Sequence, residues 1–196
     1  MSGARRAAFL DRDGVINVDH GYVVRQEEFD FVPGVLQASA QLIADGYALV
    51  VVTNQSGIGR GLYTTADFER LTAWMKARFA SAGAPLAGVY FCPHHPVDAQ
   101  EPYRRQCDCR KPAPGLLLQA QRELDLSLVD SVLFGDRRSD LLAAAAAGVP
   151  TRVLLGTDGS ADPTEDAPEA SARFRSLADA VASSWWRSRH AVVRRG

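Results

Sequence analysis

The stretch AFLDRDGVIN, residues 8–17, joins an apolar run directly to two acids, Asp11 and Asp13, and a glycine. Its apolar part belongs to RAAFL, residues 6–10, a pattern typical of a buried β-strand. Because a buried strand has no partners for bare carboxylates, the two acids must lie at or beyond its end. We interpret this stretch as a strand whose carboxyl end carries reactive groups.

Short apolar runs alternate with helical patterns along most of the chain. We expect strands over 6–10, 47–53, 86–92, 131–136 and 150–156, and helices over 33–46, 64–83, 112–126, 139–148 and 174–186. This order predicts an α/β fold with a mainly parallel, Rossmann-like sheet and helices on both faces. Four polar residues stand at or just beyond predicted strand ends: Asp11, Asp13, Thr53 and Asp136. Ligands of such sheets bind at the carboxyl ends of the strands, so we expect these residues to meet on one rim.

The size and charge of the chain limit the classes of protein to consider. Its 196 residues, 46% of them hydrophobic, suffice for one domain, which we place over residues 1–186. No apolar run approaches the roughly 20 residues of a membrane span, and the N-terminal apolar stretch is too short for a signal peptide. With a net charge of −1, we expect a cytoplasmic monomer that binds neither nucleic acid nor membranes. We expect residues 157–172 to form a surface loop and the basic segment 187–196 to be a disordered tail.

The two acids after the first strand indicate metal-assisted chemistry. Carboxylates that crowd together raise one another's pKa unless a cation lies among them. Mg²⁺ is the natural candidate because it is a hard ion that binds carboxylate and phosphate oxygens. One acid can attack phosphorus and form an aspartyl-phosphate while the other transfers a proton. A D-x-D pair alone is equally consistent with a strand that simply turns into a loop.

Three further stretches bring polar groups to a predicted strand end or helix start. They are VVVTNQSG (50–57) with Thr53 and Asn54, CRKP (109–112) with Arg110 and Lys111, and FGDRRSD (134–140) with Asp136 and Asp140. The first offers a hydroxyl, an amide and backbone N–H groups to phosphate oxygens. The second places cations at a helix start, where an anion is favoured. The third supplies carboxylates suited to a metal ligand and a supporting acid.

The order of these motifs resembles the haloacid dehalogenase superfamily of phosphotransferases: D-x-D-G, then Thr or Ser, then Lys, then G-D-x-x-x-D. The resemblance spans residues 9–148. It implies that Asp11 is the nucleophile and that Asp13 is the general acid and base. It also implies that Thr53 and Lys111 hold the phosphoryl group during catalysis.

The same resemblance implies a magnesium site and an open cavity. Mg²⁺ would be bound by the Asp11 carboxylate, the Asp13 backbone carbonyl and Asp136. Asp140 would bind through water or orient its neighbours. The insert over about residues 14–33 is too short for a separate cap domain.

A second metal site is predicted by the cysteines, which all lie within CPHHPVDAQEPYRRQCDC, residues 92–109. The ligand set is Cys92, His94, Cys107 and Cys109. Three thiolates and an imidazole make a closed tetrahedral zinc site, so the ion would be structural and would fasten a long loop. His95 competes with His94, which we favour because its spacing matches on both sides. The alternative is three reduced surface cysteines.

The zinc loop and its flanking motifs resemble one small subgroup of the superfamily, which contains phosphatases of heptose bisphosphates and of histidinol phosphate. The matching stretches are FLDRDGVINVDHGYV, VVVTNQSGIGRG and CDCRKPAPG. NVDHGYV, residues 17–23, favours the heptose substrate. The resemblance then implies removal of the 7-phosphate of D-glycero-D-manno-heptose 1,7-bisphosphate, in the ADP-heptose branch of lipopolysaccharide synthesis. Histidinol phosphate is the alternative substrate.

The resemblance also implies which residues contact the substrate: Asp19, His20, Gly21, Tyr22, Thr53, Asn54, Gln55, Ser56, Arg110 and Lys111. A bisphosphate carries a second anionic group, which guanidinium groups recognise well. Arg110 and Arg137 are suitably placed for it, and Arg60 is a further candidate. The family often has lysine where this chain has Arg137, a change that keeps the charge but alters its reach. The alternative for Arg137 and Arg138 is a solvated pair at a helix start.

Two other classes of protein remain open at this point. A phospho-accepting signalling domain also uses an acidic sheet edge, Mg²⁺ and an aspartyl-phosphate, but it needs neither Asp13 as a proton carrier nor a zinc loop. A zinc-stabilised binding module on an inactive phosphatase fold is the other. The complete set of acids and Lys111 argues against it.

Overall fold

One six-stranded, all-parallel sheet forms the centre of the molecule in a computed structural model that describes residues 4–156 and 167–190. The strands are β1 (Arg5–Leu10), β2 (Ala48–Asn54), β3 (Leu86–Cys92), β4 (Leu126–Gly135), β5 (Thr151–Leu155) and β6 (Ala172–Phe174). Their order in the sheet is β3-β2-β1-β4-β5-β6. The predicted parallel α/β fold is confirmed, and β1 lies between β2 and β4.

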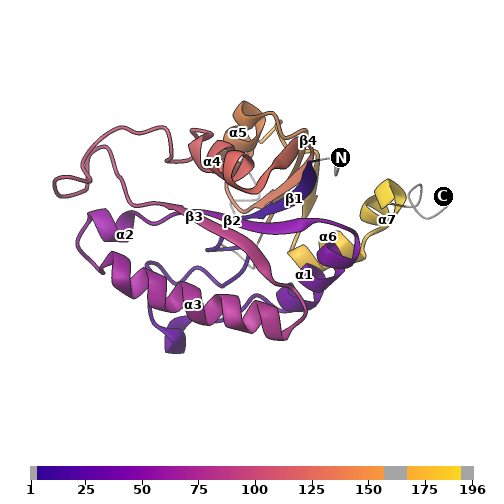
Figure 1. Cartoon of the computed structure of the whole chain (residues 1–196), viewed down its shortest axis with the longest axis horizontal. Coiled ribbons are helices and arrows are strands. Elements are labelled where there is room, and N and C mark those ends of the chain that lie inside the picture. The colour runs from indigo at the N-terminus through magenta and orange to yellow at the C-terminus, as the bar shows by residue number, and fades with distance from the viewer. Residues whose placement is uncertain (1–3, 157–166, 191–196) are drawn as a thin grey trace.

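Helices cover both faces of the sheet (Figure 1). They are η1 (Gln26–Glu28), α1 (Val35–Ala44), α2 (Ser56–Gly59), α3 (Thr65–Ser81), α4 (Gly115–Leu124), α5 (Arg138–Ala147), α6 (Leu177–Ala182) and α7 (Ser184–His190). In β1, Ala8 and Leu10 pack against α1, α3 and α6, whereas Ala7 and Phe9 face α4 and α5. This two-residue alternation of buried side chains is what a strand covered on both faces requires.

The insert after the first strand stays small. Between β1 and α1, the structure has the short helix η1 and otherwise turns and isolated bridges, so this part of the chain forms no separate cap. The rim of the sheet is therefore covered by loops and not by a second domain.

None of the helices within the described residues is long and apolar enough to cross a membrane.

The C-terminal segment differs from the single helix predicted over 174–186. It forms β6, α6 and α7, with a break at Ser183, whose backbone is extended (φ −73°, ψ 158°). The Ser183 hydroxyl accepts the backbone N–H of Trp186 at 3.1 Å and so begins a new helix. The helix α7 continues to His190, into the segment predicted as a tail. The remainder of that segment, 191–196, and most of the predicted loop 157–172 lie outside the described residues.

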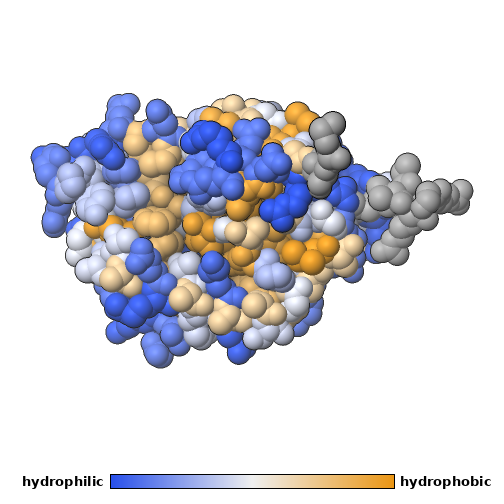
Figure 2. Space-filling view, in the orientation of Figure 1, coloured by the Kyte–Doolittle hydropathy of each residue, from blue (hydrophilic) through white to orange (hydrophobic). Residues whose placement is uncertain are grey.

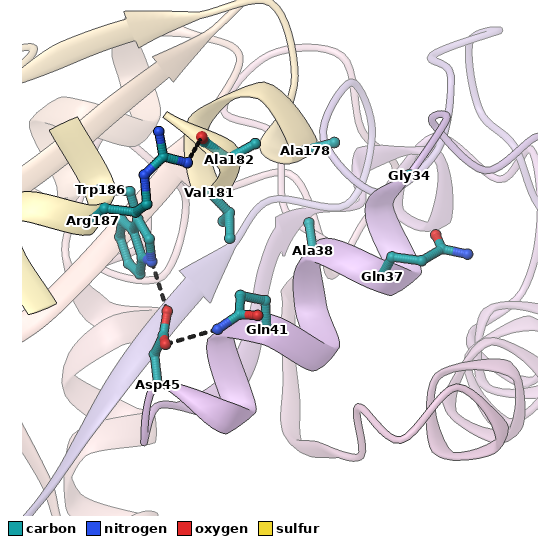
Figure 3. A pocket seen from close by; sticks show the side chains of 10 residues that line it. All are labelled: Gly34, Gln37, Ala38, Gln41, Asp45, Ala178, Val181, Ala182, Trp186 and Arg187. Carbon is teal, nitrogen blue, oxygen red and sulfur yellow. Dashed lines mark hydrogen bonds between the residues drawn. The ribbon is translucent and has the colours of Figure 1, made fainter. Parts of the chain in front are cut away.

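An apolar groove of about 620 Å³ runs between α1 and the pair α6–α7 (Figure 3). The Trp186 indole N–H donates to Asp45 at 2.7 Å, and Gln41 donates to the other oxygen of Asp45 at 2.9 Å. The first bond fastens α7 to the end of α1, and the second holds the Asp45 carboxylate in place. Within the described part of the chain, the predicted site residues do not line this groove.

Candidate active site

The carboxyl ends of three adjacent strands form the floor of a cavity of about 610 Å³. Asp11 follows β1, Thr53 lies near the end of β2, and Asp136 follows β4. Most of the residues predicted for the site line this cavity: Asp11, Asp13, Asp19, Gly21, Tyr22, Thr53, Asn54, Gln55, Ser56, Arg110, Lys111, Arg137 and Asp140. The parallel order of the strands thus brings together residues that are far apart in the sequence.

Three acids and one lysine form a buried cluster at this floor. Carboxylate oxygens of Asp11, Asp136 and Asp140 lie within 4.8 Å of one another. The Lys111 ammonium is 3.0 Å from an Asp11 oxygen, 2.6 Å from an Asp140 oxygen and 2.9 Å from the carbonyl of Val52. Arg137 approaches from the exposed side, with its Nε 3.8 Å from an Asp136 oxygen, so two cations face three carboxyl groups.

Burial and mutual repulsion shift the pKa values of this cluster. Burial raises the pKa of Asp11 to about 7, and the neighbouring acids add to the shift against the opposing effect of Lys111. Burial, with the charges of Asp11 and Asp140, likewise raises the pKa of Asp136 to about 8. Burial opposes the charge of Lys111, but the two neighbouring acids outweigh it and raise the pKa of the ammonium. When all three acids are ionised, the negative charge of the cluster exceeds its positive charge.

The acids fit a divalent cation. Oδ1 of Asp136 is buried and has no hydrogen-bond partner among the described residues. A Cβ at Gly14 would lie 2.3 Å from the other Asp136 oxygen, and Gly14 has φ +85°, so only glycine lets the loop after β1 pass so close. Asp140 differs, because its two oxygens already bind Lys111 and the backbone N–H of Arg137. An unpartnered carboxylate oxygen in an acidic cluster is a suitable Mg²⁺ ligand, with Asp140 in a supporting position.

Asp13 is held by a buried arginine that the sequence analysis missed. Arg12 is 2% exposed and donates to both Asp13 oxygens, at 2.8 and 3.0 Å through Nη2. Arg12 also donates to the carbonyl of Val23 at 2.9 Å, and Asn17 donates to Asp13 at 3.1 Å. The signal in the sequence was the arginine between the two acids of the D-x-D motif. The Asp13 carboxylate is thus fixed at the cavity wall.

The end of β2 and the loop after it contact both the loop after β1 and the loop that carries Lys111. Gln55 donates through Nε2 to Thr53 Oγ1 and to Asp13 Oδ2, each at 2.9 Å. Tyr63, which the sequence analysis also missed, donates to Gln55 Oε1 at 2.6 Å. The Asn54 amide donates to the carbonyl of Lys111 and accepts its N–H, both at 3.1 Å. The Asn54 side chain therefore fastens the lysine loop to β2.

Three arginines line the more exposed part of the cavity: Arg60, Arg110 and Arg137. Each has a partner on the protein. Arg60 pairs with Asp98 at 3.1 Å, and Arg110 donates to the carbonyl of His94 at 3.2 Å. Arg137 is 67% exposed at its side chain and pairs with Asp19 at 3.0 Å. Positively charged side chains therefore gather on this side of the cavity, with Arg60 and Arg137 each paired with an acid.

Some residues of the stretch 17–23 line the cavity, and others lie on the exposed surface. Asp19, Gly21 and Tyr22 line the cavity. His20, predicted to contact substrate, does not line it among the described residues. Its imidazole instead lies 2.8 Å from Asp30 on the exposed surface. The backbone turns between neighbouring residues here, because the Asp19 carboxylate accepts the N–H of Gly21 at 3.0 Å.

The cysteine cluster gathers in the loop between β3 and α4, which projects from the body of the molecule in Figure 1 and has a hydrophilic surface in Figure 2. Its donors are Cys92, His94, Cys107 and Cys109. The hydrogen-bond-range distances between their sulfur and Nδ1 atoms are 3.2–3.6 Å. Metal–sulfur bonds of about 2.3 Å in a tetrahedron require sulfur atoms roughly 3.8 Å apart, so an ion fits after a small expansion.

The contacts of the two imidazoles favour His94 over His95 as the fourth donor. His95 Nδ1 already accepts the backbone N–H groups of Val97 and Asp98, at 3.3 and 2.8 Å. Burial lowers the pKa of both imidazoles, so protonation does not distinguish them. His94 Nδ1, however, lies 3.6 Å from Cys92 Sγ and 3.3 Å from Cys109 Sγ, whereas His95 has no such contact among the described residues. The His94 carbonyl accepts from Arg110, so the donor cluster touches the cavity through its backbone.

Known proteins resemble this chain along most of its length. A family model described as HAD-hydrolase-like matches residues 108–182. A D-glycero-β-D-manno-heptose-1,7-bisphosphate 7-phosphatase of Photorhabdus laumondii is 49% identical over 173 residues, 88% of this chain and 92% of that protein. The protein of the same name from Escherichia coli K12 is 51% identical over 80% of this chain and 82% of that protein.

A solved structure is also similar. The D,D-heptose 1,7-bisphosphate phosphatase of B. bronchiseptica, complexed with magnesium and phosphate, matches with a TM-score of 0.76 and 35% identity, over 88% of this chain and 94% of that chain. The resemblance inferred from the motifs is confirmed by these relatives. The chain belongs to the heptose-1,7-bisphosphate 7-phosphatase family of HAD-like hydrolases and is a phosphoric monoester hydrolase.

Proposed function

We propose that this enzyme removes the 7-phosphate of D-glycero-β-D-manno-heptose 1,7-bisphosphate, with Mg²⁺ as cofactor. The observation that carries the proposal is the arrangement of charges in the cavity. Buried acids and Lys111 occupy its floor, and three arginines line its more exposed part. Such a cavity accommodates one phosphate at the reacting floor and a second anionic group beside the guanidiniums. The sugar and its anomer are proposed by analogy with the relatives named D-glycero-β-D-manno-heptose-1,7-bisphosphate 7-phosphatase.

The first chemical step in this proposal is attack by an Asp11 oxygen on the phosphorus of the 7-phosphate. Asp11 Oδ1 accepts the N–H of Arg12 at 2.7 Å and the Lys111 ammonium at 3.0 Å, which leaves Oδ2 for bond formation. A bond forms between Oδ2 and phosphorus, and the bond from phosphorus to the sugar oxygen breaks. Lys111 and the Thr53 hydroxyl stabilise the negative charge on the phosphoryl oxygens.

Asp13 carries the proton in both steps. In the first, it gives a proton to the departing sugar oxygen, so that an alcohol and not an alkoxide leaves. In the second, its carboxylate takes a proton from a water that attacks the aspartyl-phosphate. Inorganic phosphate then leaves, and the Asp11 carboxylate is regenerated. This requires Asp13 to leave or share its bonds with Arg12 during turnover.

The two metal sites have different roles in this proposal. Asp11, Asp136 and the backbone carbonyl of Asp13 hold Mg²⁺, which when bound neutralises charge that develops on the phosphoryl group. Cys92, His94, Cys107 and Cys109 hold zinc, which fixes the loop that presents Arg110. With four protein donors, this second ion has no open position for substrate and is structural.

The arginines also argue for a sugar bisphosphate over histidinol phosphate. Histidinol phosphate carries an ammonium group on the carbon next to its phosphorylated CH2 and an imidazole at its far end, and it has no second anionic group. Bringing these basic groups beside Arg60, Arg110 and Arg137 gains no charge attraction, whereas a second phosphate does. The product of the reaction would be a heptose 1-phosphate, which we place in the ADP-heptose branch of lipopolysaccharide synthesis.

Phosphate release tests this function directly. We would compare kcat/KM on both anomers of the heptose bisphosphate, on a heptose 7-monophosphate and on histidinol phosphate, each with Mg²⁺. The expected order puts the β-bisphosphate first and histidinol phosphate last. The monophosphate isolates the contribution of the second phosphate. If kcat/KM were equal for the heptose 7-monophosphate and the β-bisphosphate, the arginines would have no role in substrate recognition. A higher kcat/KM on histidinol phosphate would overturn the substrate.

A further inference from the structure

Three hydrogen bonds join four polar side chains along one wall of the cavity. Tyr63 contacts Gln55, and Gln55 contacts both Thr53 and Asp13. The chain of contacts therefore runs from a tyrosine outside the reacting groups to a phosphate-binding hydroxyl and to the proposed proton carrier. No other side chain among the described residues bonds to both Thr53 and Asp13.

The orientation of the Gln55 amide decides what its two neighbours can do. With Nε2 toward the cavity, Gln55 gives one N–H to the Asp13 carboxylate and one to the Thr53 oxygen. Thr53 then acts as acceptor to Gln55 and keeps its own proton for a phosphoryl oxygen. A flipped amide would set a carbonyl against the Asp13 carboxylate and take the Thr53 proton. Only one of the two orientations suits the reaction.

Tyr63 is placed so that it selects this orientation. Its hydroxyl lies 2.6 Å from Gln55 Oε1, and burial raises the pKa of Tyr63 to about 12, so the phenol remains a proton donor. The ring is 8% exposed and packs with Ile58 and Phe68. A Cβ at Gly57 would lie 2.2 Å from the ring, so the glycine allows this close approach.

We propose that Tyr63 is a positioning residue of this phosphatase: it fixes the Gln55 amide so that Asp13 and the Thr53 hydroxyl are both oriented for the reaction. Tyr63 lines the cavity but is assigned no contact with the reacting atoms. The inference rests on the proposed roles of Asp13 and Thr53. It adds a residue from outside the acid and lysine motifs to the machinery.

The proposal gives Tyr63→Phe a specific signature. The variant keeps the ring and its packing but removes the bond that selects the amide orientation. Loss of proton transfer matters most when the leaving group is a poor one. We therefore expect kcat on a sugar phosphate to fall about tenfold. On p-nitrophenyl phosphate, whose leaving group needs little protonation, kcat should fall only about threefold, through the Thr53 contact and the hydrolysis of the aspartyl-phosphate, which both substrates share.

The test is a double-mutant cycle with Gln55→Ala, using both substrates. If Tyr63 acts through Gln55, then Tyr63→Phe changes kcat less than about twofold in the Gln55→Ala background. Gln55→Glu keeps an acceptor for Tyr63 but sets a carboxylate against Asp13, so it should show the same dependence on leaving group. Tyr90→Phe is the matched control, because it removes a buried phenol hydroxyl beside Glu123, on the far face of the sheet.

Either of two results would overturn the role of Tyr63: equal losses on both substrates, or additive effects of the two substitutions. Unchanged sugar-phosphate turnover in Gln55→Glu would do the same, even if Tyr63→Phe were poorly folded. Failure of the proposed function gives a different pattern. The wild-type enzyme would then turn over a simple alkyl phosphate but not the heptose bisphosphate, and the comparison of leaving groups would still decide the role of Tyr63.

Discussion

The acid cluster and the cysteine cluster are both suited to metal ions, but they are assembled in different ways. Asp11 and Asp136 come from distant parts of the chain, and rigid neighbouring strands bring them together. The four donors of the cysteine cluster lie within residues 92–109, almost entirely in a projecting loop. The sheet prepares the first site whether or not an ion is bound. We expect the second to depend on its ion for order, because its donors lie in a projecting loop with a hydrophilic surface.

The difference predicts opposite responses to the loss of a ligand. In the acid cluster, the fold holds charges together at a cost, and removing one relieves repulsion. In the cysteine cluster, the ion supplies the cross-links, and removing a donor loosens the loop. Activity and stability should therefore separate at the first site and fall together at the second.

Asp11→Asn should have the largest effect on rate. It removes the proposed nucleophile, so we expect kcat to fall by roughly 10⁴-fold or more. Because burial raises the pKa of Asp11 to about 7, its ionised form costs stability in the fold, and the neutral amide should leave the melting temperature unchanged or higher. Asp30→Asn is the matched control at an exposed acid. Near-normal activity in Asp11→Asn would remove the nucleophile from the proposal.

Proton competition should give the next largest effect. With pKa values of about 7 for Asp11 and about 8 for Asp136, both carboxyls hold protons at pH 6 that Mg²⁺ must displace. Because two protons are displaced, apparent Mg²⁺ affinity should rise about 50-fold from pH 6 to 7. A flat profile, measured by calorimetry, would contradict the shifted pKa values.

The same protons fix the sign of the stability change. The folded, metal-free protein binds more protons than the unfolded chain between about pH 4 and pH 8, so its free energy of unfolding should fall as the pH rises through this range. Saturating Mg²⁺ should oppose that fall. Thermal melts at several pH values, with and without Mg²⁺, measure both effects.

Cys109→Ser should affect stability and activity together. Loss of a donor weakens the ion that orders the loop, and a destabilisation of about 2 kcal/mol lowers the melting temperature by roughly 4–8 °C. We also expect KM to rise about tenfold, since Arg110 follows directly in the sequence. His95→Gln is the control, because His95 adjoins the cluster without being one of its donors. Elemental analysis that finds no zinc in active wild-type protein would refute the site.

Arg110→Lys should have the smallest effect. It tests the contact between the two regions, because Arg110 lines the cavity and donates to His94 of the cysteine cluster. Lysine keeps the charge but cannot offer the fork of a guanidinium to both the His94 carbonyl and a phosphate. We expect KM for the bisphosphate to rise about threefold, with kcat and zinc content unchanged. Arg25→Lys, at an exposed arginine, serves as control. An equal change of KM for a monophosphate would show that Arg110 does not read the second phosphate.

The sequence predicted the sheet and the acids well because both follow local rules. Apolar runs with a two-residue or continuous pattern fix strands, and Asp11, Thr53 and Asp136 stand beside their ends. Their meeting then follows from parallel pairing alone. The break at Ser183 was missed because an apolar pattern continues through it, although the serine caps the next helix.

The contacts that orient the site could not be predicted in this way. Arg12 and Tyr63 hold Asp13 and Gln55 through side-chain hydrogen bonds that depend on how loops pack. The motif predicts that His20 lies beside the substrate, whereas in the structure its imidazole lies 2.8 Å from Asp30 and does not line the cavity within the described residues. Periodicity places the backbone, but it does not say which way a loop side chain points.

The position of β1 between β2 and β4 has a consequence for the order in which this protein is made. A ribosome releases β1 and β2 early, and these strands can pair as soon as both have emerged. β4, which Asp136 follows, emerges much later and must be inserted against the other edge of β1. The acid cluster is therefore incomplete until most of the chain has been translated.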